Sequence, residues 1–324
     1  MGLGRLVNGT WKTTRDQEDS DGRFLRPETD FHQWLKANGS GAPVEADRYH
    51  LYVSLACPWA HRTLITRELK GLTDAISLSI VDPHMGEEGW AFSDYPGTVP
   101  NRVNGAQYLR ELYTLTDPNI SGRVTVPVLW DRKDGGIVNN ESREIIRMFD
   151  HECGAIAQND VDLCPPELKP QVDETIDAIY QPINNGVYRA GFATQQGAYE
   201  EAVSDLFDAL DHWEQVLGKQ RYLCGDRLTE ADICMYTTLI RFDVVYYVHF
   251  KCNLRHITDY PNLWGYLRDL YQSPAFKRTT NFDHIKTHYY TSHPGVNPHG
   301  IVPKGPIIDF EREPDRGRFA PVSA

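Results

Sequence analysis

One cysteine of this chain stands where a thiol could react. Cys57 opens the run Cys57-Pro58-Trp59-Ala60, and Pro58 suits the first turn of a helix. A cysteine at a helix N-terminus gains thiolate character from the macrodipole and the free backbone N–H groups, and the thiolate is the nucleophile. Because no second cysteine stands at CxxC spacing, Cys57 would act as a monothiol that an external thiol must resolve. The alternative is a buried cysteine that happens to precede a proline.

The other cysteines and a spaced histidine pair indicate no second reactive site. Five cysteines remain: Cys153, Cys164, Cys224, Cys234 and Cys252. We expect each of them to be a small buried apolar side chain. His284 and His288 are four residues apart, as metal ligands on a helix can be, but no third ligand stands at a convincing spacing. The sequence therefore predicts no metal site.

Val126-Pro127 is a second feature with chemical meaning. A proline inside a strand pattern usually marks an edge strand or a special bond. In a thioredoxin-like fold Pro127 would be a cis proline facing the nucleophile, and the backbone of Val126 would be free to pair with an extended peptide ligand. A trans proline in an edge strand is the alternative.

Glu141-Ser142 is the third feature, at the predicted start of a helix. One of the two residues would ordinarily cap that helix. A helix N-terminus also binds carboxylates, and the Glu141 side chain could receive an ammonium group. Together they could hold the end of an α-amino acid, such as the γ-glutamyl head of glutathione.

Tyrosines in the second half of the chain form the fourth feature. The candidates are Tyr188, Tyr246, Tyr247, Tyr289 and Tyr290. Aromatic residues on helices are mostly core, and we expect this of about half of these. The others offer hydroxyl groups that can bind or protonate a phenolic substrate.

The residues around Cys57 place it between a strand and a helix. Leu51 and Val53 alternate with His50 and Tyr52, which predicts a strand. Apolar residues then recur at helical spacing, and residues 75–81 predict a second strand.

The order of the next elements completes a known arrangement. A long polar and aromatic insert covers 82–122, followed by a strand over 124–130 with Pro127 inside it. A turn and a second short strand make a hairpin, and a helix begins near Glu141. Strand, helix, strand, insert, hairpin and helix is the order expected of a thioredoxin-like domain.

The second half of the chain reads as helical. Apolar residues recur at helical period over 167–185, 196–217, 229–250 and 261–272. Thr229 and Asp232 fit a capping box at the start of the third stretch. The predicted fold is therefore α/β plus all-α, a thioredoxin-like domain followed by an all-helical one. We divide the chain into an N-terminal extension (1–45), a thioredoxin-like glutathione-binding domain (46–150), a linker (151–166), an all-helical substrate domain (167–291) and a C-terminal tail that wraps the surface (292–324).

Composition limits the classes of partner. The 324 residues carry a formal net charge of -12 and a sequence pI of about 5.4, whereas nucleic-acid binders usually carry a basic stripe. An acidic protein can still hold a basic pocket for a small anion. No signal-peptide core and no apolar stretch of membrane-spanning length occurs. We expect a cytoplasmic protein with no membrane or nucleic-acid partner.

These motifs together resemble one family. The whole chain is similar to the glutathionyl-hydroquinone reductases, the omega-like Xi class of glutathione transferases, over roughly residues 24–310. The resemblance is carried by Tyr49–Arg62, Gly89-Trp90, Arg123–Trp130, Asn140–Ser142, Asn184–Tyr188, Leu228–Ile233 and Asn281–Ile285. The cysteine motif and Asn184–Tyr188 are specific to this branch, whereas Thr229–Ile233 is shared by glutathione transferases generally.

The resemblance implies an activity, a co-substrate and a set of site residues. Such enzymes use glutathione to remove the glutathionyl group from glutathionyl-hydroquinones, which yields hydroquinone and glutathione disulfide. The implied nucleophile is Cys57, with Tyr188 and Tyr289 also catalytic. Glutathione would be held by Trp90, Arg123, Val126, Glu141 and Ser142. The aromatic pocket would be lined by Tyr188, Tyr246 and Tyr289. The family also implies a homodimer formed through the helical domain.

One departure and two alternatives stay open. Val244 stands where the family has a proline, which could shift the helix that carries Tyr246. A conventional glutathione transferase that conjugates electrophiles is the first alternative, although it usually uses a Tyr or Ser hydroxyl where this chain has Cys57. A non-enzymatic ligand-binding scaffold of the same fold is the second, and it predicts an unreactive Cys57.

Overall fold

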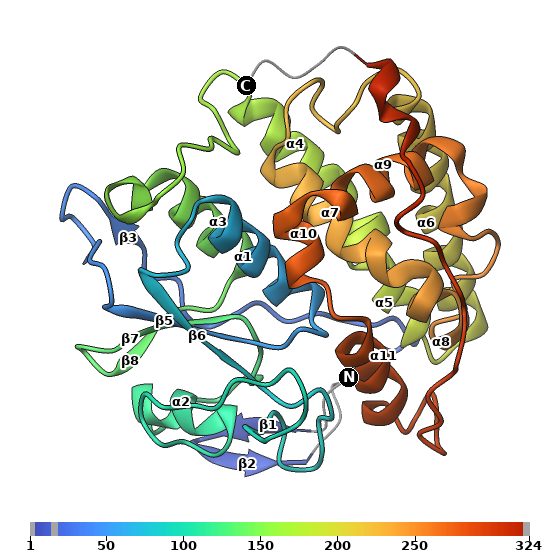
Figure 1. Ribbon diagram of the computed structural model, residues 1–324. Coiled ribbons are helices and arrows are strands. Elements are labelled where there is room, and N and C mark those ends of the chain that lie inside the picture. The colour runs from blue at the N-terminus through green and yellow to red at the C-terminus, as the bar shows by residue number, and fades with distance from the viewer. Residues whose placement is uncertain (1–3, 14–18, 320–324) are drawn as a thin grey trace.

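The computed structural model describes residues 4–13 and 19–319, so parts of the expected extension (1–3 and 14–18) and tail (320–324) lie outside it. Two halves lie side by side: a small sheet with its helices, and a larger bundle of helices (Figure 1). This confirms the predicted fold class, α/β followed by all-α. Each half has its own apolar core, and the two cores meet along α1 (Pro58–Leu69).

The sheet of the first half has the strand order β6-β5-β7-β8. Its strands are β5 (Tyr49–Val53), β6 (Ile76–Ile80), β7 (Val128–Asp131) and β8 (Gly136–Asn139). β5 pairs parallel with β6 and antiparallel with β7, and β7 and β8 form the predicted hairpin. All five residues of β5 are buried, although the sequence alternates, because both faces of the sheet are covered.

Helices cover the two faces of this sheet. α1 and α3 (Ser142–His151) pack together on one face, and α2 (Leu109–Thr116) lies on the other (Figure 1). α2 lies inside the insert 82–122, where no helix was predicted. It is eight residues long and buries Leu109, Leu112 and Tyr113, so tertiary packing rather than a long periodic pattern defines it.

One predicted strand in this half begins later than expected. β7 begins at Val128, after Pro127, because proline has no N–H to donate to a ladder. The Val126–Pro127 bond is cis, which is the first of the two alternatives that the sequence left open. The expected linker 151–166 begins inside structure, because α3 continues to His151 and a 3-10 turn follows at Cys153–Ile156.

The second half contains all four predicted helical stretches and three helices more, one of which directly follows the first stretch. Its helices are α4 (Lys169–Ile179), α5 (Gly186–Gly191), α6 (Gln196–Leu217), α7 (Glu230–Arg241), α8 (Tyr247–His249), α9 (Pro261–Gln272), α10 (Pro274–Thr279) and α11 (Phe282–Ser292). π-turns at Tyr180–Asn184 and Phe242–Tyr246 interrupt the first and third stretches. The capping box of Thr229 and Asp232 is confirmed. α10 and α11 were not predicted as helices.

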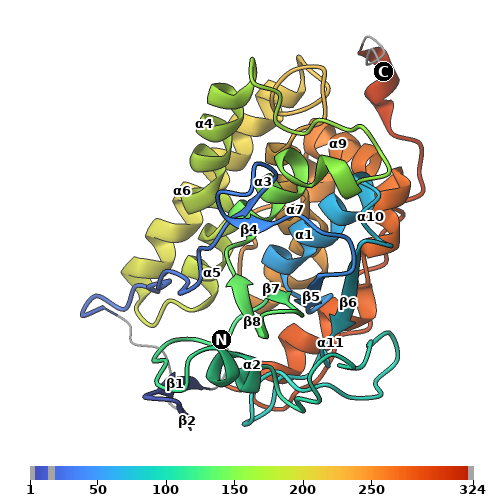
Figure 2. The same cartoon turned by 90° about the vertical axis from the view of Figure 1, so that its left-hand side faces the viewer.

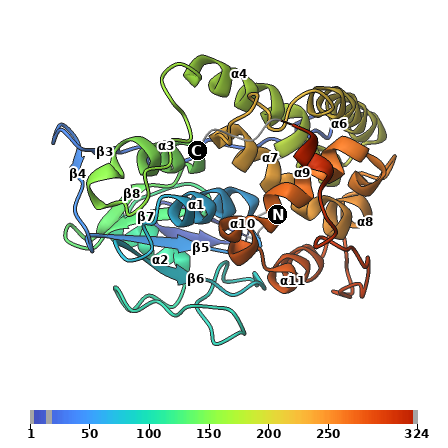
Figure 3. The same ribbon diagram turned by 45° about the horizontal axis from the view of Figure 1, so that its top comes forward.

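The contact between the halves holds the start of α1. α1 packs against α7 and α10, and Figure 3 shows α10 beside it. Arg241, the last residue of α7, is fully buried and donates to the carbonyls of Leu55 and Ala56, just before Cys57, at 3.0 and 2.8 Å. Arg241 also donates to Nδ1 of His61, so this ring is neutral and carries its proton on Nε2. That nitrogen lies 3.0 Å from the Thr279 hydroxyl oxygen.

The described parts of the extension and the tail lie against the body, as expected. The extension contains β1 (Arg5–Val7), β2 (Thr10–Lys12), β3 (Leu35–Lys36) and β4 (Ala42–Pro43), and Figure 2 shows β1 and β2 near α2. The tail runs along the helical half in red (Figure 1) and ends in a 3-10 turn at Asp315–Arg318. There Arg316 is fully buried and donates to the carbonyls of Leu217, Gln220 and Arg221.

Membrane insertion finds no support in the described helices. The longest of them, α6, carries acidic side chains along its length. In residues 4–13 and 19–319, no helix has both the length and the apolar content needed to cross a bilayer.

Candidate functional site

Cys57 lies at the junction of β5 and α1, as predicted. It is the N-cap residue of α1, with Pro58 in the first turn, and its carbonyl accepts from His61 N at 3.0 Å. Its side chain is half-buried, while the five other cysteines are buried free thiols, as expected. The Cys57 sulfur lies 3.5 Å from the carbonyl oxygen of Val126, to which the thiol donates. The cysteine and the residue before the cis proline therefore face each other.

The surroundings of Cys57 act on its charge in opposite directions. Burial raises the pKa of the Cys57 thiol above its usual value. The backbone N–H groups of Ala60 and Trp59 and the charges of Arg241 and Arg26 oppose that rise. The expected gain in thiolate character at the helix N-terminus is thus present, but burial outweighs it.

A cavity of about 220 Å³ opens on one side of Cys57 and is called cavity A here. It is lined by Arg26, Pro27, Glu28, Thr29, Asp30, His32, Trp59, Arg123, Thr125, Val126, Pro127, Asn140, Glu141, Ser142 and Tyr180. Four of the five residues predicted to bind glutathione therefore share this cavity: Arg123, Val126, Glu141 and Ser142. They come from the irregular segment that leads into β7 and from the start of α3.

One carboxylate oxygen of Glu141 caps a helix, and the other makes a long contact at the wall of cavity A. Oε1 accepts from the backbone N–H of Arg143 at 3.0 Å, which makes Glu141 the N-cap of α3. Oε2 is 3.5 Å from the Thr29 hydroxyl on the cavity wall. Ser142 lies beside it and accepts from Arg62 at 3.4 Å. A helix N-terminus next to a carboxylate can hold an α-carboxylate and an α-ammonium group at once.

A second cavity of about 110 Å³, cavity B, adjoins cavity A and contains Cys57 in its wall. Its lining also includes Met85, Trp90, Tyr188, Phe192, His288, Tyr289 and His293. Trp90, the fifth residue predicted to bind glutathione, stacks on the His288 ring with 4.7 Å between ring centres. Arg26, Trp59, Arg123 and Val126 border both cavities, so one ligand can reach from cavity A past Cys57 into cavity B.

Three of the five candidate tyrosines form a chain of hydroxyl groups beside cavity B. The Tyr289 hydroxyl lies 2.5 Å from that of Tyr188 and 3.0 Å from that of Tyr246. Tyr188 and Tyr289 line the cavity, whereas Tyr246 is fully buried behind them. Val244, which replaces the expected proline, has therefore not displaced Tyr246 from Tyr289.

The other two tyrosines lie elsewhere. Tyr247 stacks on His256, with ring centres 3.6 Å apart, and the Tyr290 hydroxyl donates to the carbonyl of Val244. Neither residue lines cavity A or cavity B. About half of the candidates are thus structural, as the composition of helical cores suggested.

His284 and His288 each hydrogen-bond to a different backbone carbonyl group. His284 Nε2 lies 2.7 Å from the Pro96 carbonyl, and His288 Nδ1 lies 2.9 Å from that of Pro83. A carbonyl can only accept, so Nδ1 of His288 carries the proton and Nε2 is a bare acceptor. Burial lowers the pKa of His288 to about 3, so the ring stays neutral.

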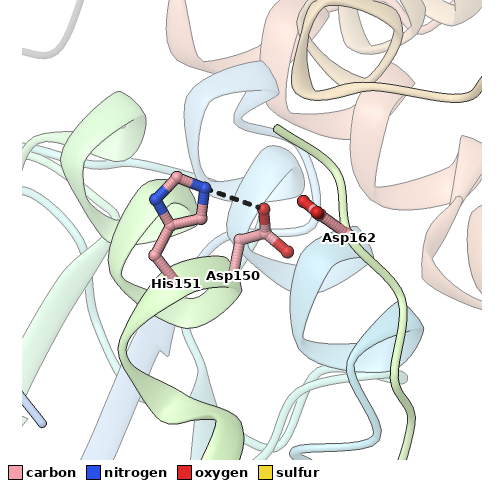
Figure 4. A group of neighbouring side chains, drawn as sticks. All are labelled: Asp150, His151 and Asp162. Carbon is pink, nitrogen blue, oxygen red and sulfur yellow. Dashed lines mark ion pairs between the residues drawn. The ribbon is translucent and has the colours of Figure 1, made fainter. Parts of the chain in front are cut away.

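Within the described residues, one group of side chains has the spacing of metal ligands: Asp150, His151 and Asp162 (Figure 4). Its polar atoms already have partners. Asp150 binds the Lys70 ammonium at 3.0 Å and accepts from Leu163 N, and His151 bonds to the Cys164 carbonyl. The group ties α3 to the segment after it and lies outside both cavities.

Sequence analysis missed several residues of the site. Arg26 and Trp59 separate the cavities, and Phe192, His288 and His293 close cavity B. Trp59 and His288 stand next to predicted site residues, which is the signal that could have found them. Arg26 lies in the extension, where no periodic pattern links it to Cys57.

Comparisons with known proteins agree with this geometry. Residues 56–152 match the family model of the glutathione S-transferase N-terminal domain, and residues 196–269 match that of the C-terminal domain. The glutathionyl-hydroquinone reductase YqjG of Escherichia coli is 51% identical over 318 residues, which cover 95% of this chain and 97% of that protein. A solved Xi-class transferase from Natrialba magadii is 54% identical, with a TM-score of 0.94 over 99% of this chain and 98% of that one. The chain belongs to the Xi class of glutathione transferases.

A further structural relative of this Xi-class transferase was solved with glutathione bound. That structure of Escherichia coli YqjG is 52% identical, with a TM-score of 0.87 over 92% of this chain and 99% of that one. Cys57, Val126, Glu141 and Ser142 fall inside the matched N-terminal segment, whereas Tyr188, Tyr289 and Arg26 fall outside both matched segments. About half of the wall of cavity A thus lies in the general transferase framework, and the tyrosines of cavity B lie beyond it.

Proposed function

We propose that this Xi-class transferase is a glutathionyl-hydroquinone reductase. It uses glutathione to convert a glutathionyl-hydroquinone into the free hydroquinone, with release of glutathione disulfide. The observation that carries the proposal is the place of Cys57, a single thiol that lines the cavity with the tyrosines and faces Val126, which also lines the cavity suited to glutathione. The domain of residues 46–150 binds glutathione, and the domain of 167–291 binds the aromatic part.

Glutathione occupies cavity A in this proposal. Its γ-glutamyl ammonium group meets Glu141, and its α-carboxylate meets Ser142 and the N-terminus of α3. Its cysteinyl main chain pairs with the backbone of Val126, which brings its sulfur next to Cys57. Arg123 and Trp90 hold the remaining part, toward cavity B.

The first step exchanges one bond to the glutathione sulfur. The Cys57 sulfur attacks the sulfur of the bound glutathionyl-hydroquinone, an S–S bond forms, and the bond from sulfur to the aromatic carbon breaks. The pair of electrons of that bond stays on the aromatic carbon, which takes a proton. Tyr188 and Tyr289 supply and orient this proton, and the proton lost by the Cys57 thiol balances it. The products are hydroquinone and a Cys57–glutathione mixed disulfide.

The second step restores the enzyme by thiol–disulfide exchange. The thiolate of a second glutathione attacks the glutathione sulfur of the mixed disulfide, and Cys57 leaves as a thiolate. Glutathione disulfide is released, and Cys57 regains a proton. Overall, the thiol of one glutathione and the thioether sulfur of the substrate are oxidised to glutathione disulfide, and the aromatic carbon–sulfur bond is reduced to a carbon–hydrogen bond.

The test is direct. The protein is incubated with a glutathionyl-hydroquinone and glutathione, and hydroquinone release is followed by chromatography. We expect turnover by the parent protein and none by Cys57→Ala. A Cys57→Ala variant that turns over as fast as the parent would overturn the mechanism. Conjugation of a chloronitrobenzene acceptor, run in parallel, would favour a conventional transferase if it were the faster reaction.

We further propose that the chain forms a homodimer through its helical half and works in the cytoplasm. Val248 and Leu254, at and after α8, are large apolar side chains that are 61% and 64% exposed, and both belong to the helical half that would form the interface. Sedimentation velocity should give the mass of a dimer for the parent and of a monomer for Val248→Glu/Leu254→Glu. An unchanged mass in that double variant would show that Val248 and Leu254 do not form the dimer interface. Cell fractionation would test the compartment.

A further inference from the structure

Arg26 lies at the boundary between cavity A and cavity B, although it belongs to neither domain. It comes from the N-terminal extension and lines both cavities. The extension is fixed near it by the ion pair of Arg23 with Glu201 at 2.9 Å and by the hydrogen bond from Thr194 N to the Gly22 carbonyl. The segment before the first domain therefore supplies one wall of the site.

Aromatic rings and one amide hold the Arg26 guanidinium in place. Its central carbon lies 4.7 Å from the ring centre of Tyr188, 4.9 Å from that of Trp59 and 5.3 Å from that of Phe24. Its Nε donates to the Asn185 side-chain carbonyl at 2.8 Å. Cations at such distances from a ring face are attracted by the ring quadrupole. The charge thus lies on the face of Tyr188, next to the wall that holds Cys57.

No carboxylate neutralises this charge in the described structure. Arg26 takes part in none of the ion pairs among residues 4–13 and 19–319, and its Nη2 is buried without a hydrogen-bond acceptor there. Arg241, the other cation that acts on Cys57, has its N–H groups bound to backbone carbonyls and His61. A positive charge held over neutral rings favours any negative charge that forms beside it.

We propose that Arg26 is a positioning residue of the reaction, which fixes Tyr188 and stabilises the negative charge that forms on Cys57 and on the Tyr188 oxygen. Burial raises the pKa of both Cys57 and Tyr188, and the charge of Arg26 opposes the rise in each. This inference rests on the proposed function only for the identity of the substrate. It explains why the site needs the extension.

Other polar groups also lie near Cys57, and their ionisation is distinguishable from the effect of the Arg26 charge. The groups that line its cavity or act on its charge are Arg123, Tyr188, Arg241, His288, Tyr289 and His293. Burial lowers the pKa of His288 to about 3 and that of His293 well below its usual value, so both rings favour the neutral form. A change in the pH dependence of Cys57 reactivity after substitution of Arg26 therefore reports the loss of the Arg26 charge.

The experiment measures the rate of Cys57 alkylation by iodoacetamide between pH 5 and 10, with intact mass to count the alkyl groups. Two variants separate charge from structure: Arg26→Gln keeps an amide donor without charge, and Arg26→Lys keeps charge without the planar group. We expect Arg26→Gln to raise the pKa of Cys57 by about one unit, a tenfold slower alkylation at pH 7, and Arg26→Lys to stay within about threefold of the parent. Arg255→Gln, which removes a positive charge that pairs with Asp211 outside both cavities, should behave as the parent.

Two outcomes would overturn the proposal. One is an Arg26→Gln profile identical to that of the parent. The other is an equal shift in Arg26→Gln and Arg26→Lys, which would show that only the shape of the arginine matters. Because alkylation uses neither glutathione nor hydroquinone, these outcomes are independent of turnover. A parent protein that releases no hydroquinone would refute the proposed function and leave the effect of Arg26 on Cys57 as measured.

Discussion

The chain of three tyrosine hydroxyls gives the most detailed prediction. Three hydroxyl protons serve two internal hydrogen bonds, at 2.5 and 3.0 Å, so one proton is left over. If Tyr246 donates to Tyr289 and Tyr289 to Tyr188, the spare proton is on Tyr188 and faces cavity B. In the opposite direction the spare proton would be on the fully buried Tyr246, whose hydroxyl makes its one well-formed hydrogen bond among the described residues with Tyr289, and a donor left without such a bond costs about 1–3 kcal/mol. The structure therefore favours Tyr188 as the proton donor to the substrate.

This direction sets a rank order for three conservative variants. Tyr188→Phe removes the donor itself and should lower kcat by about a hundredfold or more, as the loss of a general acid does. Tyr246→Phe removes one neutral hydrogen bond from the far end of the chain. A bond of this kind contributes about 1 kcal/mol, so kcat should fall by roughly fivefold with little change in KM. Tyr289→Phe breaks both bonds and should fall between the two.

The assay is hydroquinone release under saturating glutathione. Tyr290→Phe is the matched control, because it removes a hydroxyl from the same helix as Tyr289 but outside both cavities. We expect it to keep the kcat of the parent. Equal losses in Tyr246→Phe and Tyr188→Phe, or full activity in Tyr188→Phe, would refute the reasoning from the direction of the chain.

Three further predictions concern glutathione binding and stability. Glu141→Gln keeps the cap on Arg143 N but loses the charge that faces cavity A, so the Kd for glutathione measured by calorimetry should rise roughly tenfold, and an unchanged Kd would contradict the assignment. Burial lowers the pKa of His50 and His249 to about 4 and that of His288 to about 3, so unfolding takes up protons below about pH 6.5. The free energy of unfolding should therefore fall by roughly 2 kcal/mol per ring between pH 7 and 5, beyond the effect of carboxylates. In His50→Asn the free energy of unfolding should fall less steeply over the same range. Arg316→Ala leaves the carbonyls of Leu217, Gln220 and Arg221 without their donor. The free energy of unfolding in urea should fall by about 3 kcal/mol, with kcat unchanged. Equal urea midpoints for the variant and the parent would show that the tail does not stabilise the helical half.

Much of the fold could be predicted because local patterns define it. β5, α1, β6 and the hairpin follow from alternation, helical period and turn residues, and Thr229 with Asp232 marks the start of α7. α2 was missed because it is one short amphipathic segment inside a polar insert. The π-turns escape prediction for another reason: they depend on packing between helices, which no single segment encodes.

The same division applies to the site. Cys57, Val126 and Glu141 were found because each stands at the end of a strand or the start of a helix, where the chemistry of a position follows from local structure. Arg26 and His288 were not assigned to the site, because their roles arise from contacts with residues far away in the chain. Tyr246 was expected to line the cavity, and it reaches the cavity only through Tyr289.

The covalent intermediate on Cys57 tests the central claim most directly. The parent protein, mixed with one equivalent of glutathionyl-hydroquinone and no free glutathione, is examined by intact-mass and peptide-mass spectrometry while hydroquinone is measured. We predict one hydroquinone released for each glutathionyl group gained, with that group on Cys57 and removed as glutathione disulfide when glutathione is added. Hydroquinone release without an adduct, or with the adduct on another cysteine, would contradict the account.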